Sequence, residues 1–164
     1  MKPLVKVASP AALAVLRQAT ALAPLRKKAS DGLLPSTAHF KQNPDSDHNT
    51  GLAVDLTHDP KHGIDCKEIY KNLKEDDRVS YLIFNGRIWS KRGGDRKYTG
   101  INKHNKHLHI SIKPECANNT SSWFWWRNEP KLVNQVLAGL STPRSKKPAK
   151  VALRPIRKTK KKGK

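Results

Sequence analysis

Two short apolar segments of this chain carry side chains that bind metal ions, and together they constrain the fold more than any other feature. The first segment, Leu52 to Thr57, is typical of a buried strand and contains Asp55. The second, Lys106 to Ile112, alternates in polarity. It places His107 and His109 on one face, because alternate residues of a strand point the same way. The fold must therefore bring two segments together that are far apart in the sequence.

A further imidazole lies close to Asp55 in the sequence. His48 precedes it by seven residues, at the edge of a polar loop, and Gly51 between them permits a tight bend. An ionised carboxylate on a core strand costs several kcal/mol unless it is paired or bound to a cation. Two histidines and one carboxylate hold zinc with one coordination position open, which is what a catalytic zinc ion requires. We therefore expect Zn²⁺ as the cofactor.

The order of predicted elements favours an α+β fold, with a small antiparallel sheet and flanking helices. An Asn-Gly pair between two apolar runs is a strong hairpin signal, and a Ser-Pro pair marks the start of the first helix. The expected elements are a helix from Pro10 to about Ala23 that buries Leu13 and Leu16, a strand within Leu33–Phe40, the strand Leu52–Thr57, a helix within Asp65–Asp76, a hairpin over Val79–Trp89, a basic loop over Lys91–Asn105, the strand Lys106–Ile112 and a final helix over Glu129–Leu140.

Charge divides the chain into a domain over residues 1–140 and a tail over residues 141–164. The net charge is +20, and the tail holds 11 Lys and Arg and no acidic residue. The first 140 residues hold 22 basic and 13 acidic residues, a net charge of +9. We expect the tail to be disordered and attracted to a polyanion, which would be nucleic acid, anionic lipid or an anionic cell-wall polymer.

The sequence predicts no membrane span, because no run of 18 apolar residues occurs. The Ala/Leu-rich stretch from Ala11 to Leu25 is interrupted by Arg17 and has no clean cleavage site after it, so we expect cytoplasmic synthesis without an export signal. We also expect a monomer. Cys66 and Cys116 are isolated thiols whose pairing the sequence leaves open, and neither belongs to a CxxC pair that would bind zinc.

The ten residues that end at Asp55 resemble a known peptidase motif. Their fixed positions, Ser46, His48, Gly51, Ala53 and Asp55, match the SxHxxGxAxD motif of the M15 peptidases, which are D-Ala-D-Ala carboxypeptidases and endopeptidases. That family shares a zinc fold with the LAS peptidases and the hedgehog signalling domain, whose HxH pair is matched by His107 and His109. The resemblance spans about residues 30–113 and implies a hedgehog/D-Ala-D-Ala peptidase-like fold.

The resemblance implies a role for each matched residue. His48, Asp55 and His109 would bind zinc, and His107 would stand beside the metal as a catalytic residue that stabilises the transition state. Ser46 would shape the loop or touch the substrate. Zinc would activate a water molecule that attacks an amide of a peptidoglycan stem peptide. Such an enzyme would act at the bacterial cell wall, as a phage endolysin does, with the basic tail attached to an anionic wall polymer.

One position departs from the family pattern. The family usually places a carboxylate, as the general base, three residues before the last zinc ligand, and this chain has Lys106 there. A lysine is a cation at neutral pH and does not accept a proton unless its pKa falls steeply. Either another group serves, or the metal alone lowers the pKa of the water enough for slower turnover, or the domain is not a hydrolase. His107 is the first candidate base, ahead of Asp95 and Glu115.

Other residues admit two interpretations each. His104 is either a further ligand or, as we favour, a solvated loop residue. His58 and His62 are expected at the surface. Arg87 begins a basic stretch that either is a solvated face or grips a substrate carboxylate, for which guanidinium geometry is suited. The aromatic run Trp123–Trp126 is expected to anchor the final helix in the core, and the alternative is a platform for sugar rings or lipid headgroups.

Two other functions compete with the peptidase. Lys106 favours a zinc-containing cell-wall-binding domain that is weakly active or inactive. The high positive charge favours a metal-dependent nuclease or nucleic-acid-binding protein. A nuclease should carry a basic groove at its metal, whereas a wall enzyme can concentrate its charge in the tail.

Overall fold

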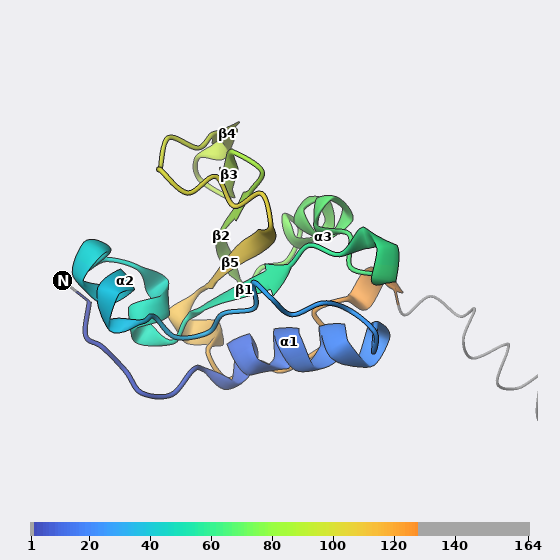
Figure 1. Ribbon diagram of the computed structural model, residues 1–164, viewed down its shortest axis with the longest axis horizontal. Coiled ribbons are helices and arrows are strands. Elements are labelled where there is room, and N and C mark those ends of the chain that lie inside the picture. Colours follow the sequence, from blue (N-terminus) through green and yellow to red (C-terminus); the bar gives the residue numbers. More distant parts are fainter. Residues whose placement is uncertain (1, 128–164) are drawn as a thin grey trace, which may run out of the picture. The chain divides into compact units, whose positions relative to one another are not determined.

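The computed structural model describes residues 2–127, which belong to one compact unit (Figure 1). The final helix expected over Glu129–Leu140 and the tail over residues 141–164 lie outside the described residues. In chain order the described elements are α1 (Pro10–Leu22), α2 (Thr37–Gln42), a 3-10 turn (Asp47–Thr50), β1 (Ala53–Thr57), a 3-10 turn (Pro60–His62), α3 (Cys66–Leu73), β2 (Val79–Phe84), β3 (Arg87–Ser90), β4 (Gly94–Lys97), β5 (His107–Ile112) and two 3-10 turns (Pro114–Cys116 and Trp125–Arg127).

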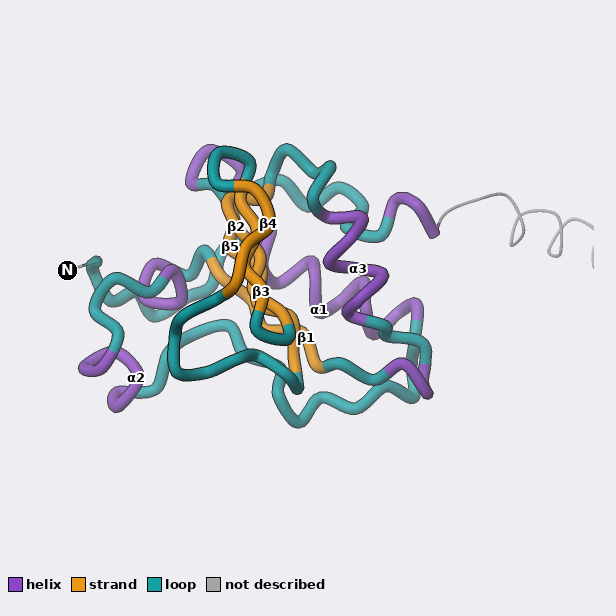
Figure 2. The backbone as a smooth tube through the Cα atoms, turned by 90° about the horizontal axis from the view of Figure 1, so that it is seen from above, coloured by secondary structure: helices purple, strands orange, loops and turns teal. Residues whose placement is uncertain are grey.

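The strands form a five-stranded antiparallel sheet in the order β1-β5-β2-β3-β4. Helices α1 and α3 pack on one face of this sheet, and α2 lies on the other side (Figure 2). The expected α+β class with a small antiparallel sheet and flanking helices is therefore confirmed. Among the described residues no helix is both long and apolar enough to cross a membrane.

Strand β5 lies between β1 and β2, and its side chains point alternately to the two faces of the sheet. Its even-numbered side chains, Leu108, Ile110 and Ile112, belong to the core under α1 and α3. Its odd-numbered side chains therefore point to the opposite face, as alternation along a strand requires. The predicted common face for His107 and His109 follows from this arrangement.

Several local predictions are confirmed. Ser9 caps α1 by accepting a hydrogen bond from the Ala12 N–H, and the helix ends two residues before Pro24. Asn85 and Gly86 both have positive φ angles, +46° and +74°, and join β2 to β3 as a tight hairpin. Helix α3 buries Ile69 and Leu73, as its spacing predicted.

Three local predictions are wrong. The segment Leu33–Phe40 holds no strand: Ser36 caps a helix there, α2, by accepting a hydrogen bond from the His39 N–H. The basic loop over Lys91–Asn105 contains the edge strand β4, which pairs with β3. Helix α1 presents alanines and Val15 to the core and leaves Leu13 46% exposed, because small side chains let its backbone lie close to the sheet.

The aromatic run near the end of the described chain is divided between core and surface. Trp123 and Phe124 are buried in the main core, as the core interpretation predicted, and the guanidinium of Arg78 stacks 3.7 Å from the Trp123 ring. Trp126 is partly buried and donates from Nε1 to Glu68, whereas Trp125 is 47% exposed.

Candidate metal centre

Three side chains from three elements converge on the face of the sheet opposite α1 and α3. His48 comes from the 3-10 turn Asp47–Thr50, Asp55 from the middle of β1, and His109 from the directly opposite position of β5. One ligand atom of each lies within 4.8 Å of the others, so the three could hold one metal ion. The predicted set of metal ligands is thus brought together, whereas the structure does not identify the metal.

The turn that carries His48 is built by its neighbours in the sequence. Ser46 caps it by accepting a hydrogen bond from the His48 N–H at 3.3 Å. Gly51 ends it in the left-handed conformation, at φ +68°, where an L side chain is strained. These two residues explain in physical terms why a serine and a glycine flank the histidine in this motif.

Hydrogen bonds orient the two imidazoles. His48 donates from Nδ1 to the Leu33 carbonyl at 3.0 Å, which turns Nε2 toward Asp55 Oδ1, 3.4 Å away. His109 points Nδ1 at the same oxygen, at 3.0 Å. The two imidazoles therefore approach the same carboxylate oxygen, Asp55 Oδ1, from two sides.

Charge holds this cluster together. Burial raises the pKa of the Asp55 carboxyl, but hydrogen bonds and charge from His109 and His48 outweigh it and hold that pKa well below its ordinary value. Burial lowers the pKa of His48, yet the hydrogen bond to Asp55 raises it above the ordinary histidine value. Asp55 is thus ionised at neutral pH, as a metal ligand must be.

Three further histidines surround the cluster. His107 has Nε2 3.7 Å from Asp55 Oδ2, as expected of a residue beside the metal. His104 lies in a loop, as expected, and is half-buried: its ring lies 4.9 Å from the His107 ring and 5.6 Å from the His109 ring between centroids. His39, on α2, was not predicted: its ring packs edge-on against His48 at 5.9 Å, and its Nε2 is 3.2 Å from Ser46 Oγ.

His104 and His107 are both biased toward the neutral form. Burial, followed by the charges of His109 and His107, lowers the pKa of His104 to about 4. Burial also lowers the pKa of His107, and the opposing charge of Asp55 does not restore it. His104 donates from Nδ1 to the Asn102 carbonyl at 2.7 Å, which leaves Nε2 as a free lone pair.

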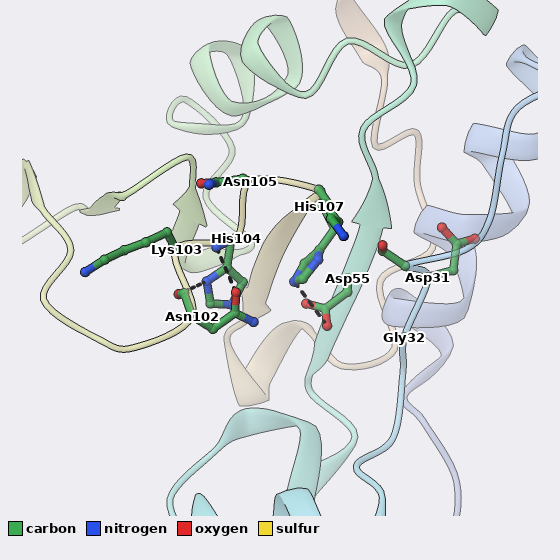
Figure 3. A pocket seen from close by; sticks show the side chains of 10 residues that line it. Asp31, Gly32, Asp55, Asn102, Lys103, His104, Asn105 and His107 are labelled. Carbon is green, nitrogen blue, oxygen red and sulfur yellow. Dashed lines mark hydrogen bonds and ion pairs between the residues drawn. The ribbon is translucent and has the colours of Figure 1, made fainter.

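A cavity of about 540 Å³ opens beside Asp55 and His107 (Figure 3). One wall is the segment Ser30–Gly32, and the other is the segment Asn102–His107. Asp31 in the first wall is already occupied, since it binds Arg26 at 2.6 and 2.9 Å and accepts from Thr57. Asp55 is therefore the carboxylate of this lining that faces the histidines.

The remaining predicted residues lie apart from the cluster or at its edge. Lys106 lines the cavity. Arg87, on β3, donates to Asp95 on β4 at 2.8 Å, and Lys74 donates to the same carboxylate, so Asp95 is no candidate base. Glu115 lies in the turn beyond the far end of β5. The structure does not bring Arg87, Asp95 or Glu115 to the candidate metal centre.

Two histidines and two cysteines are accounted for elsewhere. His58 accepts a hydrogen bond from the Cys66 N–H, and His62 binds Asp59. Cys66 is buried and Cys116 is half-buried, and the two thiols are not paired. Burial raises the pKa of the Cys66 thiol to about 12, so it is no thiolate ligand at neutral pH.

Comparison with known proteins adds one family. No curated protein and no solved structure matches the chain significantly. The family model described as the VldE C-terminal domain matches residues 13–109, which is more than half of the chain and includes His48, Asp55 and His109. The chain belongs to the VldE C-terminal domain family.

Proposed function

We propose that this protein is a zinc-dependent peptidase that hydrolyses amide bonds in peptidoglycan stem peptides. The observation that carries the proposal is the convergence of His48, Asp55 and His109 beside an open cavity. The description of the VldE C-terminal domain family names no reaction, so support comes from the site itself. The peptidase motif over residues 46–55 and the histidine pair in β5 supply the reaction class, and they also motivate the proposed hedgehog/D-Ala-D-Ala peptidase-like fold.

The spacing of the ligand atoms suits zinc. Zinc–nitrogen and zinc–oxygen distances of about 2.0–2.1 Å in a tetrahedron place neighbouring ligand atoms about 3.3 Å apart. His48 Nε2 and His109 Nδ1 lie 3.4 and 3.0 Å from Asp55 Oδ1. One carboxylate and two imidazoles also match the ligand chemistry of catalytic zinc, which leaves a fourth position for water or substrate.

In the proposed mechanism His48, Asp55 and His109 would hold the metal, whose chemistry there would be to lower the pKa of water and to polarise the scissile carbonyl. His107, beside Asp55 at the cavity wall, is placed to donate a hydrogen bond to developing negative charge. His104 keeps Nε2 free to accept a proton, because Nδ1 donates to Asn102. His104 can thus take over the missing base function, and His107, the first candidate base, would do so instead of donating this hydrogen bond.

A variant at Lys106 tests whether a histidine has replaced the missing carboxylate as the general base. Lys106 stands where the family pattern has a carboxylate, and it lines the cavity. If the missing carboxylate limits the rate, Lys106→Glu should raise hydrolysis about 10-fold or more, because general bases contribute about 10²–10⁴-fold. An unchanged or lower rate with zinc still bound would show that the missing carboxylate does not limit the rate.

The charge at the cavity favours the peptidase over a nuclease. Two lysines and two aspartates line it, and Lys103 donates its ammonium hydrogens to the carbonyls of Tyr98 and Gly100. A groove built for a phosphodiester backbone would present several unoccupied cations along its length, whereas Lys106 is the one lysine of this lining whose ammonium has no partner among the described residues.

The experiment measures bound zinc and hydrolysis together. Zinc content and release of amino groups from purified peptidoglycan are determined for the wild type, for His109→Ala and for His62→Ala. His62 is a matched control because it binds Asp59 outside the site. We expect about one zinc per chain and hydrolysis in the wild type and the control, and loss of both in His109→Ala. Bound zinc without hydrolysis would instead favour the wall-binding domain that Lys106 motivates, and absence of zinc would refute the metal site.

A further inference from the structure

The first residues of the chain run along the loop that carries His48. This segment, Lys2–Ala8, is called the arm below. Lys2 N–H donates to the Pro44 carbonyl at 2.9 Å, and Val5 N–H donates to the Asn49 carbonyl at 2.8 Å. Just beyond the arm, Ser9 N–H donates to the Gly51 carbonyl at 2.9 Å. Backbone hydrogen bonds therefore attach the arm along the whole length of the metal-binding turn.

A side-chain contact ties the arm to the turn more specifically. The ammonium of Lys2 donates to the carboxylate of Asp47, the residue directly before His48. Asp47 is largely buried, with 13% of its side chain exposed, whereas 38% of the Lys2 side chain is exposed. A largely buried carboxylate depends on such a partner for its stability.

Asp47 also reaches the strand that carries the last ligand. Its other carboxylate oxygen accepts a hydrogen bond from Ser111 Oγ, on β5 two residues after His109. Asp47 further contacts the hydroxyl of Tyr81, whose ring stacks on His109 at 5.4 Å between centroids. The carboxylate of Asp47 thus links the turn that carries His48 to Ser111 and Tyr81, which lie next to His109.

We propose that Lys2, acting through Asp47, is a positioning residue of the metal site. The arm holds Asp47 in place between Lys2 and Ser111, and Asp47 sets where the turn presents His48 relative to His109. Without the ammonium of Lys2, the buried charge of Asp47 has to move toward solvent, and the adjacent His48 moves with it. The proposal rests on the metal centre of the proposed function but not on peptide hydrolysis.

The test measures zinc affinity of the full-length protein by competition with a chromogenic chelator. Residues that support metal ligands from outside the ligand set cost about 10–100-fold in metal affinity when they are replaced. We expect such a loss for Lys2→Met and most of the affinity back in Lys2→Arg, which restores the charge. Lys6→Met is the matched control, since Lys6 is an exposed lysine of the same arm without a side-chain partner among the described residues.

A second variant separates positioning from folding. Asp47→Asn keeps the hydrogen-bonding shape at Ser111 and removes the ion pair that ties the turn to Lys2, so it should lose zinc affinity as well. Urea unfolding of each metal-free variant reports whether stability alone has changed. Equal zinc affinities of Lys2→Met and Lys6→Met would overturn the proposal, as would a loss in Lys2→Met that Lys2→Arg does not restore. Zinc binding that depends on Lys2 in a protein without hydrolytic activity would support it and refute the peptidase alone, whereas a protein that binds no zinc refutes both.

Discussion

Replacement of Gly51 by alanine probes the packing between the arm and the metal-binding turn. Gly51 has φ +68°, and a Cβ atom built there would lie 2.7 Å from the Val7 carbonyl oxygen and 3.0 Å from the Ala8 Cα. Both are backbone atoms, so neither can rotate away. The alanine side chain therefore forces the arm and the turn apart.

Two costs add up at this position. The left-handed conformation costs an L residue about 1–2 kcal/mol. Overpacking against a fixed neighbour costs about 1–3 kcal/mol more. Gly51→Ala should thus lower the free energy of unfolding by about 2–5 kcal/mol. Gly86→Ala is the matched control, because Gly86 has φ +74° and no atom within 4 Å of its Cβ position, so only the first cost applies.

Urea unfolding of the metal-free proteins, followed by far-ultraviolet circular dichroism, measures both variants against the wild type. The gain from a less flexible unfolded chain is the same for both Gly→Ala replacements and cancels in their difference. We expect Gly51→Ala to be the less stable variant by about 1–3 kcal/mol. Equal destabilisation of the two variants would refute the packing argument and leave backbone strain as the whole effect.

Two predictions concern charge. In the metal-free protein the pKa of Asp55 is depressed below 3.8 and that of His48 is raised above 6.5, so their pairing contributes fully between these values. The contribution is lost as the pH rises through the raised pKa of His48. The stability advantage of the wild type over Asp55→Asn, measured by urea unfolding from pH 5 to pH 9, should therefore shrink at high pH, and a constant difference would contradict this. Arg78→Ala leaves Asp76 buried without its partner and should cost about 3–5 kcal/mol in the same assay, whereas Lys91→Ala, which removes a fully exposed ion pair with Asp77, should cost far less. An equal loss of unfolding free energy in the Arg78 variant and the Lys91 variant would show that burial of the Arg78–Asp76 pair does not matter.

The ligand set followed from the resemblance to the peptidase motif, and the alternation of a strand accounts for part of its placement. Alternation along β5 sends Leu108 and Ile110 to the core and leaves His109 on the other face, where the β1 carboxylate lies opposite. The Asn85-Gly86 turn is equally local, since both residues adopt the positive φ angles that such a turn needs. The alternation of a strand and the conformation of a short turn depend on residues that are neighbours in the sequence, so both can be predicted without knowledge of the fold.

The outer histidines were not predictable in this way. His39 reaches His48 because a short helix capped by Ser36 lies beside the turn that carries His48, and the cap was the available signal. His104 reaches its position through a positive φ of +55° in a loop, for which the sequence offers no indication. Both depend on how loops close over the sheet, which is set by tertiary contacts.

The pairing of β1 with β5 has a kinetic consequence. Asp55 and His109 are 54 residues apart in the sequence and meet through that pairing, so a metal ion finds its ligand set after the sheet has closed. Contacts of such long range form late and slowly in small proteins. Metal binding should then leave the folding rate almost unchanged and lower the unfolding rate. The ion would stabilise the native state after it has formed and would not nucleate folding.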